Sequence, residues 1–234
     1  KAVLMFHPQK PSREWEASLR PFLQSDPILK GISILSKRRT ASLGNPRLSF
    51  TIPPSLRLRV SPESFFQVNP KQIDKLIEKV LEFSEGTKNE KTLDLYSGVG
   101  NLTLPLASVS REVLGIEENM AAVADARFNA QFNRIETVRF ICGKVEDVLK
   151  NWKRMNPDLV ILDPPRTGAK AVVGLVADFR PKKVVYVSCE PTLMARDLRL
   201  FSEKGYFLRK LALIDMFPQT YHVEVIAELT GEKS

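Results

Sequence analysis

Cysteine is scarce in this chain, which contains only Cys142 and Cys189 among its 234 residues. Two cysteines can form at most one disulfide, so the disulfide framework that is typical of small secreted domains is excluded. No CxxC pair is present, and zinc or iron–sulfur sites built from cysteine need more ligands than these two. We therefore expect neither a metal ion nor an iron–sulfur cluster.

Long hydrophobic runs are also missing. No apolar stretch approaches the roughly 20 residues that a helix needs to cross a bilayer, and the first residues lack the length and the cleavage site of a signal peptide. Internal repeats and low-complexity tracts are absent as well. We expect a cytoplasmic protein that has no membrane partner and is a monomer.

The composition is otherwise that of a globular protein with an excess of positive charge. Hydrophobic residues make up 43% of the chain, which is enough to bury a sizeable core. The formal net charge of +8 favours a polyanionic partner such as nucleic acid. A basic protein with no such partner would carry the same charge, so this observation alone does not decide between the two.

Residues 1–60 have a pattern of their own. Strand-like segments at 2–6, 28–36, 48–52 and 56–60 and a short helical segment at 12–23 predict a small α+β domain. The basic residues at 37–39 and at Arg57 and Arg59 could lie along phosphates, or could simply be solvated. The chain opens directly on a strand-like segment, so we expect this N-terminal α+β piece to be incomplete.

A boundary and a helix follow. Asn69 suits the N-cap position and Pro70 the first helical position, and apolar residues then recur on one helical face to about residue 86. From residue 91 the pattern alternates between strands and helices. The strands are expected at 92–95, 112–116, 137–142, 158–162 and 183–187, and the helices at 101–109, 119–133, 145–151, 169–179 and 192–204.

This alternation predicts an α/β fold with a doubly wound, mostly parallel sheet. Two final strand-like segments, 206–216 and 223–229, have no helix between them and should pair as an antiparallel hairpin. Together these segments make a seven-stranded, Rossmann-like sheet with a C-terminal hairpin, preceded by the small α+β domain.

Gly98 and Gly100 form a tight turn after the first strand of this sheet. A third glycine is missing, so the turn is a poor phosphate-binding fingerprint. Glu117 ends the next strand, where a carboxylate can bond both hydroxyls of a ribose. The combination favours a nucleoside cofactor, of which S-adenosylmethionine is the commonest, although an ordinary tight turn would look similar.

Three further residues end or begin strands. Cys189 follows the buried strand 183–187, at the edge of an open α/β sheet where ligands bind, but a buried structural cysteine is the alternative. Asp163 opens a stiff loop of two prolines, which could position a substrate or could reflect loop geometry alone. Glu224 lies among apolar residues, where its pKa would rise towards that of a general base, unless it sits at the surface of an edge strand.

Six segments in order, SFFQVNP, LDLYSGVGNLTLPLA, GIEEN, LDPPRTG, VYVSCEPTLMARDL and MFPQTYHVE, resemble the S-adenosylmethionine-dependent RNA uracil C5-methyltransferases, which make 5-methyluridine in tRNA and 23S rRNA. The resemblance implies that Cys189 is the nucleophile and Glu224 the base. It further implies that the cofactor is held by Gln67, Tyr96, Gly98, Glu117 and Asp163. For the RNA base it implies contacts with Phe65 and Arg166. The resemblance also implies that 1–60 are part of the family's central α+β domain and that 61–234 are the methyltransferase catalytic domain.

The sequence departs from the family pattern in three places. Segments matching the family's OB-type RNA-binding domain and its iron–sulfur cysteine cluster are missing from this sequence, and Lys144 stands where Asn or Asp is usual. The RNA target, tRNA or rRNA, is therefore open.

Two alternative functions remain. An RNA cytosine C5-methyltransferase would usually carry a second cysteine where this chain has Pro164, Pro165 and Arg166, and a non-catalytic RNA-binding fragment would have no chemistry.

For catalysis the thiolate of Cys189 should be favoured by the following helix and by Arg196 if it turns inward. Cys142 is expected to serve packing.

Overall fold

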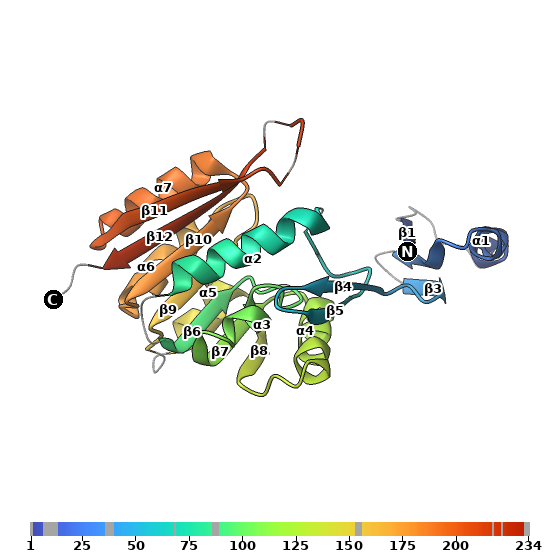
Figure 1. Ribbon diagram of the computed structural model, residues 1–234, viewed down its shortest axis with the longest axis horizontal. Coiled ribbons are helices and arrows are strands. Elements are labelled where there is room, and N and C mark those ends of the chain that lie inside the picture. Colours follow the sequence, from blue (N-terminus) through green and yellow to red (C-terminus); the bar gives the residue numbers. More distant parts are fainter. Residues whose placement is uncertain are drawn as a thin grey trace.

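The computed structural model describes residues 2–6, 14–35, 40–67, 69–85, 89–152, 156–216, 218–220 and 222–231. These residues form a large body of three layers, from which a small N-terminal piece projects at one end (Figure 1). The basic run at 37–39 lies outside the described residues.

A seven-stranded sheet forms the middle layer of the large body. In spatial order it is β11-β12-β10-β9-β6-β7-β8. The strands are β6 (Asn89–Leu95), β7 (Ser110–Glu117), β8 (Val138–Cys142), β9 (Leu159–Leu162), β10 (Lys183–Ser188), β11 (Tyr206–Ile214) and β12 (Glu224–Gly231). Strands β8, β7, β6, β9 and β10 run parallel, while β12 is antiparallel to both β10 and β11. The predicted mostly parallel sheet with a C-terminal antiparallel hairpin is confirmed.

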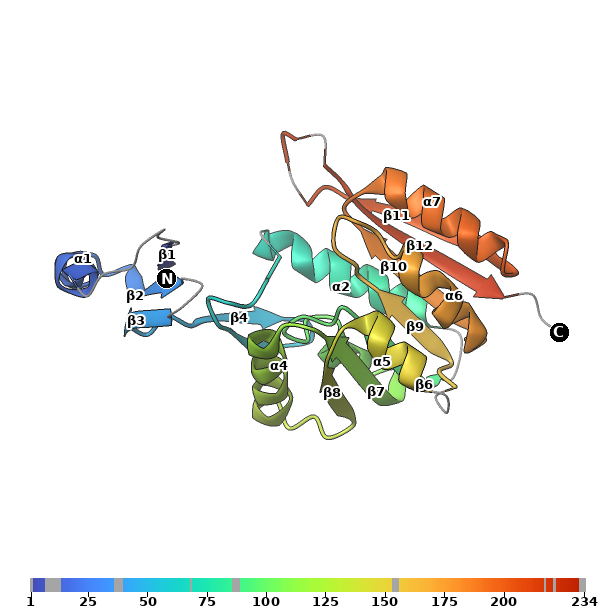
Figure 2. The same cartoon turned by 180° about the vertical axis from the view of Figure 1, so that it is seen from behind.

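Helices cover both faces of this sheet, as Figures 1 and 2 show from opposite sides. One face carries α2 (Pro70–Ser84), α3 (Thr103–Leu106) and α4 (Met120–Phe132), and the other carries α5 (Val145–Asn151), α6 (Lys170–Asp178) and α7 (Pro191–Ser202). Successive strand residues point to opposite faces, so Val184 packs in one core and Val185 in the other. This double burial explains why the central strands read as continuous apolar runs.

The strand order reverses between β6 and β9. From β6 the chain proceeds outward through β7 and β8, and it then returns to β9 and proceeds outward on the other side through β10. In sheets of this kind, ligands bind in the crevice at the carboxyl ends of the strands where the order reverses. The fold therefore places its binding crevice next to Tyr96 and Asp163, which follow the last residues of β6 and β9.

The N-terminal piece holds a three-stranded sheet of β1 (Ala2–Phe6), β2 (Leu29–Leu35) and β3 (Thr40–Gly44), with helix α1 (Glu14–Ser25) beside it. A hairpin of β4 (Leu48–Ile52) and β5 (Leu56–Val60) leads from this piece to the large body (Figure 1). Strand β3 was not predicted. Its small and polar residues have little strand propensity of their own, and pairing with β2 supplies the context that propensity lacks.

One local prediction is wrong. The helix expected at 101–109 is a single turn, and the chain continues through bonds between residues three apart, such as Ala107 N to Leu104 O at 3.2 Å. Asn69 occupies the N-cap of α2 and Pro70 begins the helix, as predicted. The Asn69 side chain makes no capping bond, and its amide nitrogen donates to Met216 O at 3.3 Å. Of the helices in the described part of the chain, none is long and apolar enough to span a membrane.

Candidate active site

A cavity of about 540 Å³ opens at the carboxyl ends of the parallel strands. Its lining residues come from the loop before α2 and from the ends of β6, β7, β9, β10 and the start of β12. They are Phe65, Phe66, Gln67, Tyr96, Gly98, Asn101, Glu117, Glu118, Asn119, Ala122, Asp163, Pro164, Pro165, Arg166, Cys189 and Glu224. Every residue predicted for the site from the sequence thus borders this one cavity, whereas Lys144 borders a different one beside Trp152.

Strand register brings Cys189 and Glu224 together. Because β12 is antiparallel to β10, its first residues lie at the edge where β10 ends, and Ser188 pairs with Val225. Continuing that register by one residue sets Cys189 opposite Glu224. Strand β11 already ends at this edge, where Ile214 pairs with Glu224, so β12 begins beside the end of β10. The thiol and the carboxylate therefore meet although 35 positions separate them in the sequence.

Glu224 is buried and carries an unpaired oxygen. Its residue is 1% exposed, and Oε2 has no hydrogen-bond partner among the described residues. Burial, together with the nearby carboxylate of Asp163, raises the pKa of Glu224 to about 8. Burial also raises the pKa of Asp163 to about 7. A carboxylate with a raised pKa accepts a proton more readily near neutral pH, which is what a general base must do.

The Cys189 thiol has an environment that differs from the sequence expectation. Burial, and next the Glu224 carboxylate, raise the pKa of this thiol, while the guanidinium of Arg166 lowers it. Arg196 does not turn toward the thiol, because it is bonded to Asp197 Oδ1 at 2.9 Å and to Thr167 O at 3.3 Å. The expected net stabilisation of the thiolate is therefore wrong, and Arg166 takes the place assigned to Arg196.

Cys142 was expected to be a packing residue, and this expectation is also wrong. The residue is exposed at the end of β8, and its Sγ donates to Glu118 O at 3.7 Å. Both cysteines are free. Cys142 does not line the cavity, so Cys189 is the one thiol among the described residues of the site.

Glu117 is fixed by two backbone amides. Oε2 accepts from Gly98 N at 3.0 Å and Oε1 accepts from Asn119 N at 2.8 Å. Gly98 adopts a positive φ of 53°, which directs its N–H in the tight turn after β6. Each carboxylate oxygen keeps a second lone pair, so the group can still accept hydrogen bonds from a ligand in the cavity.

Asp94, in β6 before this turn, is bonded to Thr103 after the turn. It is buried, and its Oδ2 accepts from Thr103 Oγ1 at 2.5 Å. Burial raises the pKa of Asp94 to about 7 against the lowering effect of the Thr103 bond, and the carboxylates of Asp163 and Glu117 raise it further. Asp94 does not line the cavity, so we assign it a supporting position only.

The loop before α2 contributes two phenylalanines to the cavity lining, one packed and one exposed. Phe66 stacks on Phe50 with ring centroids 4.3 Å apart, whereas Phe65 is 70% exposed at the cavity rim. Asn119 anchors the loop by donating to Glu63 O at 2.8 Å. An exposed aromatic ring on an anchored loop is a suitable platform for a planar base.

Asn101, Glu118, Asn119 and Ala122 line the cavity but were not singled out from the sequence. Asn101 and Asn119 lie within the quoted segments LDLYSGVGNLTLPLA and GIEEN, which is the signal that could have found them. Asn119 also caps α4, since its side chain accepts from Ala121 N and Ala122 N. Because Asn119 fits the role of a helix N-cap, the sequence alone gives no separate sign of a role in ligand binding.

Comparison with known proteins decides the family. A family model described as tRNA (uracil-5-)-methyltransferase matches residues 54–230. The chain belongs to this family. The resemblance seen in the six sequence segments is thereby confirmed, and the cavity described above is the corresponding region of a tRNA (uracil-5-)-methyltransferase family member.

Relatives of this family member include two uncharacterized RNA methyltransferases. The protein of Oceanobacillus iheyensis is 41% identical over 179 residues, which cover 75% of this chain and 39% of that protein. One from Caldanaerobacter subterraneus subsp. tengcongensis is 45% identical over 175 residues, covering 74% of this chain and 39% of that protein. The present chain thus spans 39% of the length of either relative.

A solved structure supports the same placement. The Pyrococcus abyssi tRNA (uracil-54, C5)-methyltransferase in complex with S-adenosyl-L-homocysteine superposes with a TM-score of 0.76 at 28% identity. The match covers 97% of this chain and 56% of that chain. The N-terminal piece as well as the seven-stranded body therefore has a counterpart in a solved structure.

Proposed function

We propose that this chain transfers a methyl group from S-adenosylmethionine to C5 of a uridine in tRNA or rRNA. The observation that carries the proposal is that Cys189, directly after β10, and Glu224, the first residue of the neighbouring β12, line one cavity at the sheet edge. Family membership supports the reaction type, and the Pyrococcus abyssi enzyme, which bears S-adenosyl-L-homocysteine, supports the cofactor.

The chemistry requires a nucleophile and a base at one place. Uracil C5 is a weak nucleophile, so the Cys189 thiolate first adds to C6, and the electron pair of the C5–C6 double bond makes C5 able to attack a methyl group. After transfer, C5 carries both the methyl group and its hydrogen. Glu224 then removes that hydrogen as a proton, the double bond reforms and the C6–S bond breaks, which returns the thiolate of Cys189.

The cavity residues suit a sulfonium nucleoside cofactor, which when bound supplies an electrophilic methyl group. Glu117 has lone pairs left for two ribose hydroxyls, and the Gly98 turn allows close approach of backbone. Gln67 and Tyr96 line the same cavity and would complete the cofactor pocket. Asp163, beside Glu224 in the cavity, would face the junction between cofactor and uracil.

Phe65 and Arg166 would receive the target base. A base that enters this cavity must leave its stack in the RNA, and the exposed ring of Phe65 can replace the lost stacking. Arg166 has a guanidinium close enough to Cys189 to lower the pKa of its thiol. The same positive charge would stabilise the oxygen of the enolate that forms when the thiolate adds to C6.

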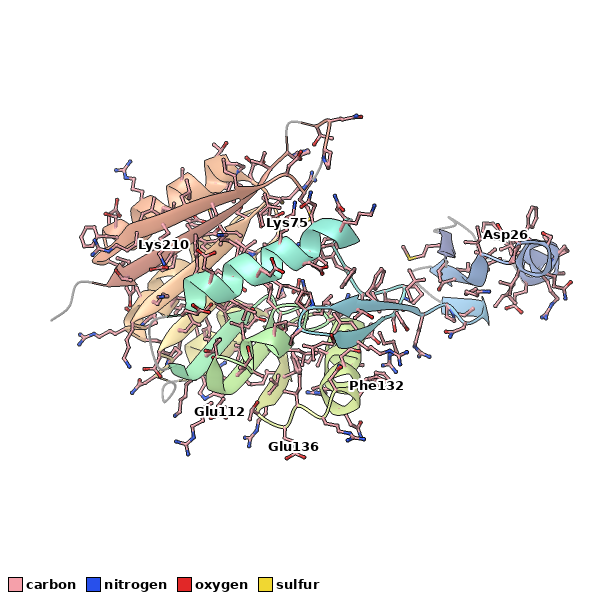
Figure 3. The ribbon with its side chains drawn as sticks, viewed as in Figure 1. Asp26, Lys75, Glu112, Phe132, Glu136 and Lys210 are labelled. Atoms are coloured by element: carbon pink, nitrogen blue, oxygen red, sulfur yellow. The ribbon has the colours of Figure 1, made fainter. Side chains whose placement is uncertain are left out.

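Replacing Glu117 by alanine should weaken S-adenosylmethionine binding by about 1.5–3 kcal/mol, because a charge-assisted contact with the ribose is lost. The dissociation constant measured by calorimetric titration should rise roughly 10- to 150-fold. We expect some loss of thermal stability too, since Gly98 N and Asn119 N lose their acceptor. Glu112, exposed on β7 at the end away from the cavity (Figure 3), gives the control Glu112→Ala. Equal affinity in Glu117→Ala and wild type would show that the ribose is held elsewhere.

The rate at which methylated RNA is released from the covalent adduct should rise with pH up to about pH 8 and then level off. Glu224 acts as the carboxylate in this step, and its pKa is raised to about 8. The group is therefore largely protonated at about pH 6, where release should be slow. Single-turnover decay of the methyl-labelled adduct at saturating cofactor tests this, and a decay rate that does not change over that interval would rule out Glu224 as a base with a raised pKa.

Analysis of nucleosides by mass spectrometry separates the alternative functions. After incubation with unmodified RNA and cofactor, the proposal expects 5-methyluridine. Appearance of 5-methylcytidine would support the cytosine enzyme, although Cys189 is the single thiol among the described cavity residues and Pro165 and Arg166 occupy the loop where that class carries its second cysteine. Absence of any methylated product would support a non-catalytic RNA-binding fragment.

A further inference from the structure

Helix α4 and strand β5 are joined by a ladder of hydrogen bonds from side chains to backbone. Asn129 Oδ1 accepts from Arg59 N at 2.7 Å, and its Nδ2 donates to Arg59 O at 3.1 Å. Asn133 makes the same pair of bonds with Arg57, at 2.9 and 2.8 Å. Four helical residues rise about 6 Å and two strand residues about 6.6 Å, so the two spacings match.

A carboxylate continues this ladder toward the active site. Asp125, which lies four residues before Asn129, accepts from Ser61 N at 2.7 Å and from Ser64 Oγ at 2.8 Å. It also accepts from Arg59 Nε at 2.8 Å. The β4–β5 hairpin and the loop that carries Phe65 are therefore held against α4 as one unit.

The ladder fixes two arginines over two phenylalanines. The guanidinium of Arg59 lies 3.7 Å from the ring centroid of Phe128, and that of Arg57 lies 5.2 Å from the ring centroid of Phe132. The two rings stack on each other at 5.9 Å and 20°. They remain 38% and 50% exposed, so the arginines cover only part of their apolar surface.

These side chains line a surface groove of about 320 Å³, which we call the arginine–phenylalanine groove. It is formed mainly by Arg47, Ser49, Arg57, Arg59, Phe128 and Phe132. No acidic residue of the described chain borders it. Arg59 is paired with Asp125, whereas Arg47 and Arg57 have no ion pair with another described residue, so the groove is positively charged.

The groove starts close to the active-site cavity. Ala122, in the first turn of α4, lines the active-site cavity, and Phe128 and Phe132 stand six and ten residues farther along the same helix. This spacing corresponds to about 9 and 15 Å along the helix axis. Figure 3 labels Phe132 at α4, whose last residue it is, near the β4–β5 hairpin.

We propose that the arginine–phenylalanine groove binds the RNA strand that flanks the target nucleotide. Arg47 and Arg57 would contact phosphates, and the exposed rings of Phe128 and Phe132 would stack on unpaired bases. Positive charge that follows the backbone, combined with aromatic stacking platforms, is the general means of binding single-stranded nucleic acid. The inference rests on the proposed function, because that function defines the target nucleotide. Its test measures RNA binding and needs no methyl transfer.

The test uses the full 234-residue chain and a fluorescein-labelled RNA hairpin with a uridine-rich loop. Fluorescence anisotropy gives the dissociation constant over a series of KCl concentrations. Phe132→Ala should raise the dissociation constant roughly 5- to 100-fold, because a stacking platform is lost. Arg57→Gln should weaken binding and reduce the slope of log affinity against log salt by about 1, because one phosphate contact is lost.

Two matched controls lie outside the groove. Arg139→Gln removes an exposed arginine at the amino end of β8, and Leu213→Ala removes a 67% exposed apolar side chain on β11. Neither should change the affinity or the salt slope. Phe132→Leu keeps most of the apolar volume without the ring, so it should weaken binding as the alanine variant does even if Phe132→Ala folds poorly.

The inference is overturned if the wild type does not bind the hairpin, or if the groove variants bind it as the wild type does. It is likewise overturned if Phe132→Ala changes self-association of the protein and leaves RNA affinity unaltered, because the groove would then be an interface between copies. If the wild type binds the hairpin without forming 5-methyluridine while the groove variants bind it weakly, the proposed function fails and the groove inference stands.

Discussion

Replacing Cys189 by alanine should abolish methyl transfer and all covalent capture of RNA. Cys189 is the single thiol of the described cavity, and the proposed reaction cannot begin until its sulfur adds to C6. Removal of a covalent nucleophile typically lowers turnover by about 10⁴-fold or more. RNA that carries 5-fluorouridine at the target gives a direct measurement, because fluorine cannot leave as a proton and the adduct survives denaturation.

Wild type incubated with this RNA and cofactor should therefore show a protein–RNA species on a denaturing gel, and Cys189→Ala should not. Cys142→Ser is the matched control. Cys142 is exposed and lies outside the cavity lining, so this variant should trap RNA and unfold as the wild type does. Trapping that persists in Cys189→Ala, or that disappears in Cys142→Ser, would contradict the assignment of the nucleophile.

Much of the fold follows from local pattern. The run Val184 to Val187 is buried on both faces, as is typical of a strand in the interior of a sheet that helices cover on both sides. Once that strand is assigned, the place of Cys189 at the ligand-binding edge follows from the general rule for open α/β sheets. The same reasoning places Glu117 and Asp163, since each directly ends or follows a strand of the same sheet.

The pairing of Cys189 with Glu224 could not be predicted in this way. The sequence indicates that 223–229 is a strand next to 206–216 in the chain, but not that it inserts between β10 and β11. That insertion is a long-range choice of partner and register, and local propensity carries no information about it. Without the insertion Glu224 would begin an edge strand, which was the competing interpretation of this residue.

The arginine that faces the thiol was missed for a related reason. Arg196 lies seven residues, or about two helical turns, from Cys189 in sequence, which makes it the natural candidate. In the fold, Asp197 is fully buried and accepts from Tyr186 Oη at 2.7 Å and from Ala169 N at 2.6 Å. This buried carboxylate needs a cation, and Arg196 provides it at 2.8 Å. The cost of an unpaired buried charge, rather than proximity in sequence, decides where Arg196 points.

Glu224→Gln should separate methyl transfer from product release. The amide keeps the size of the side chain but cannot accept the C5 proton, so attack by Cys189 and methyl transfer should proceed and the adduct should then stall. A covalent protein–RNA species should accumulate on ordinary, unfluorinated RNA and should carry label from methyl-labelled cofactor. Turnover should fall by about 10²- to 10⁴-fold, the range for loss of a general base.

A structural role for Glu224 predicts a different result, namely lower stability and uniformly lower activity with no trapped species. The two roles can be told apart because Oε2 of Glu224 has no hydrogen-bond partner among the described residues, so its replacement by an amide breaks no hydrogen bond at that atom. Thermal unfolding and cofactor titration of Glu224→Gln should therefore remain near wild type. Normal turnover in this variant, or lost activity without a labelled adduct, would transfer the role of base to another group, with Asp163 the next candidate because it ends β9 at the same edge and its pKa is raised to about 7.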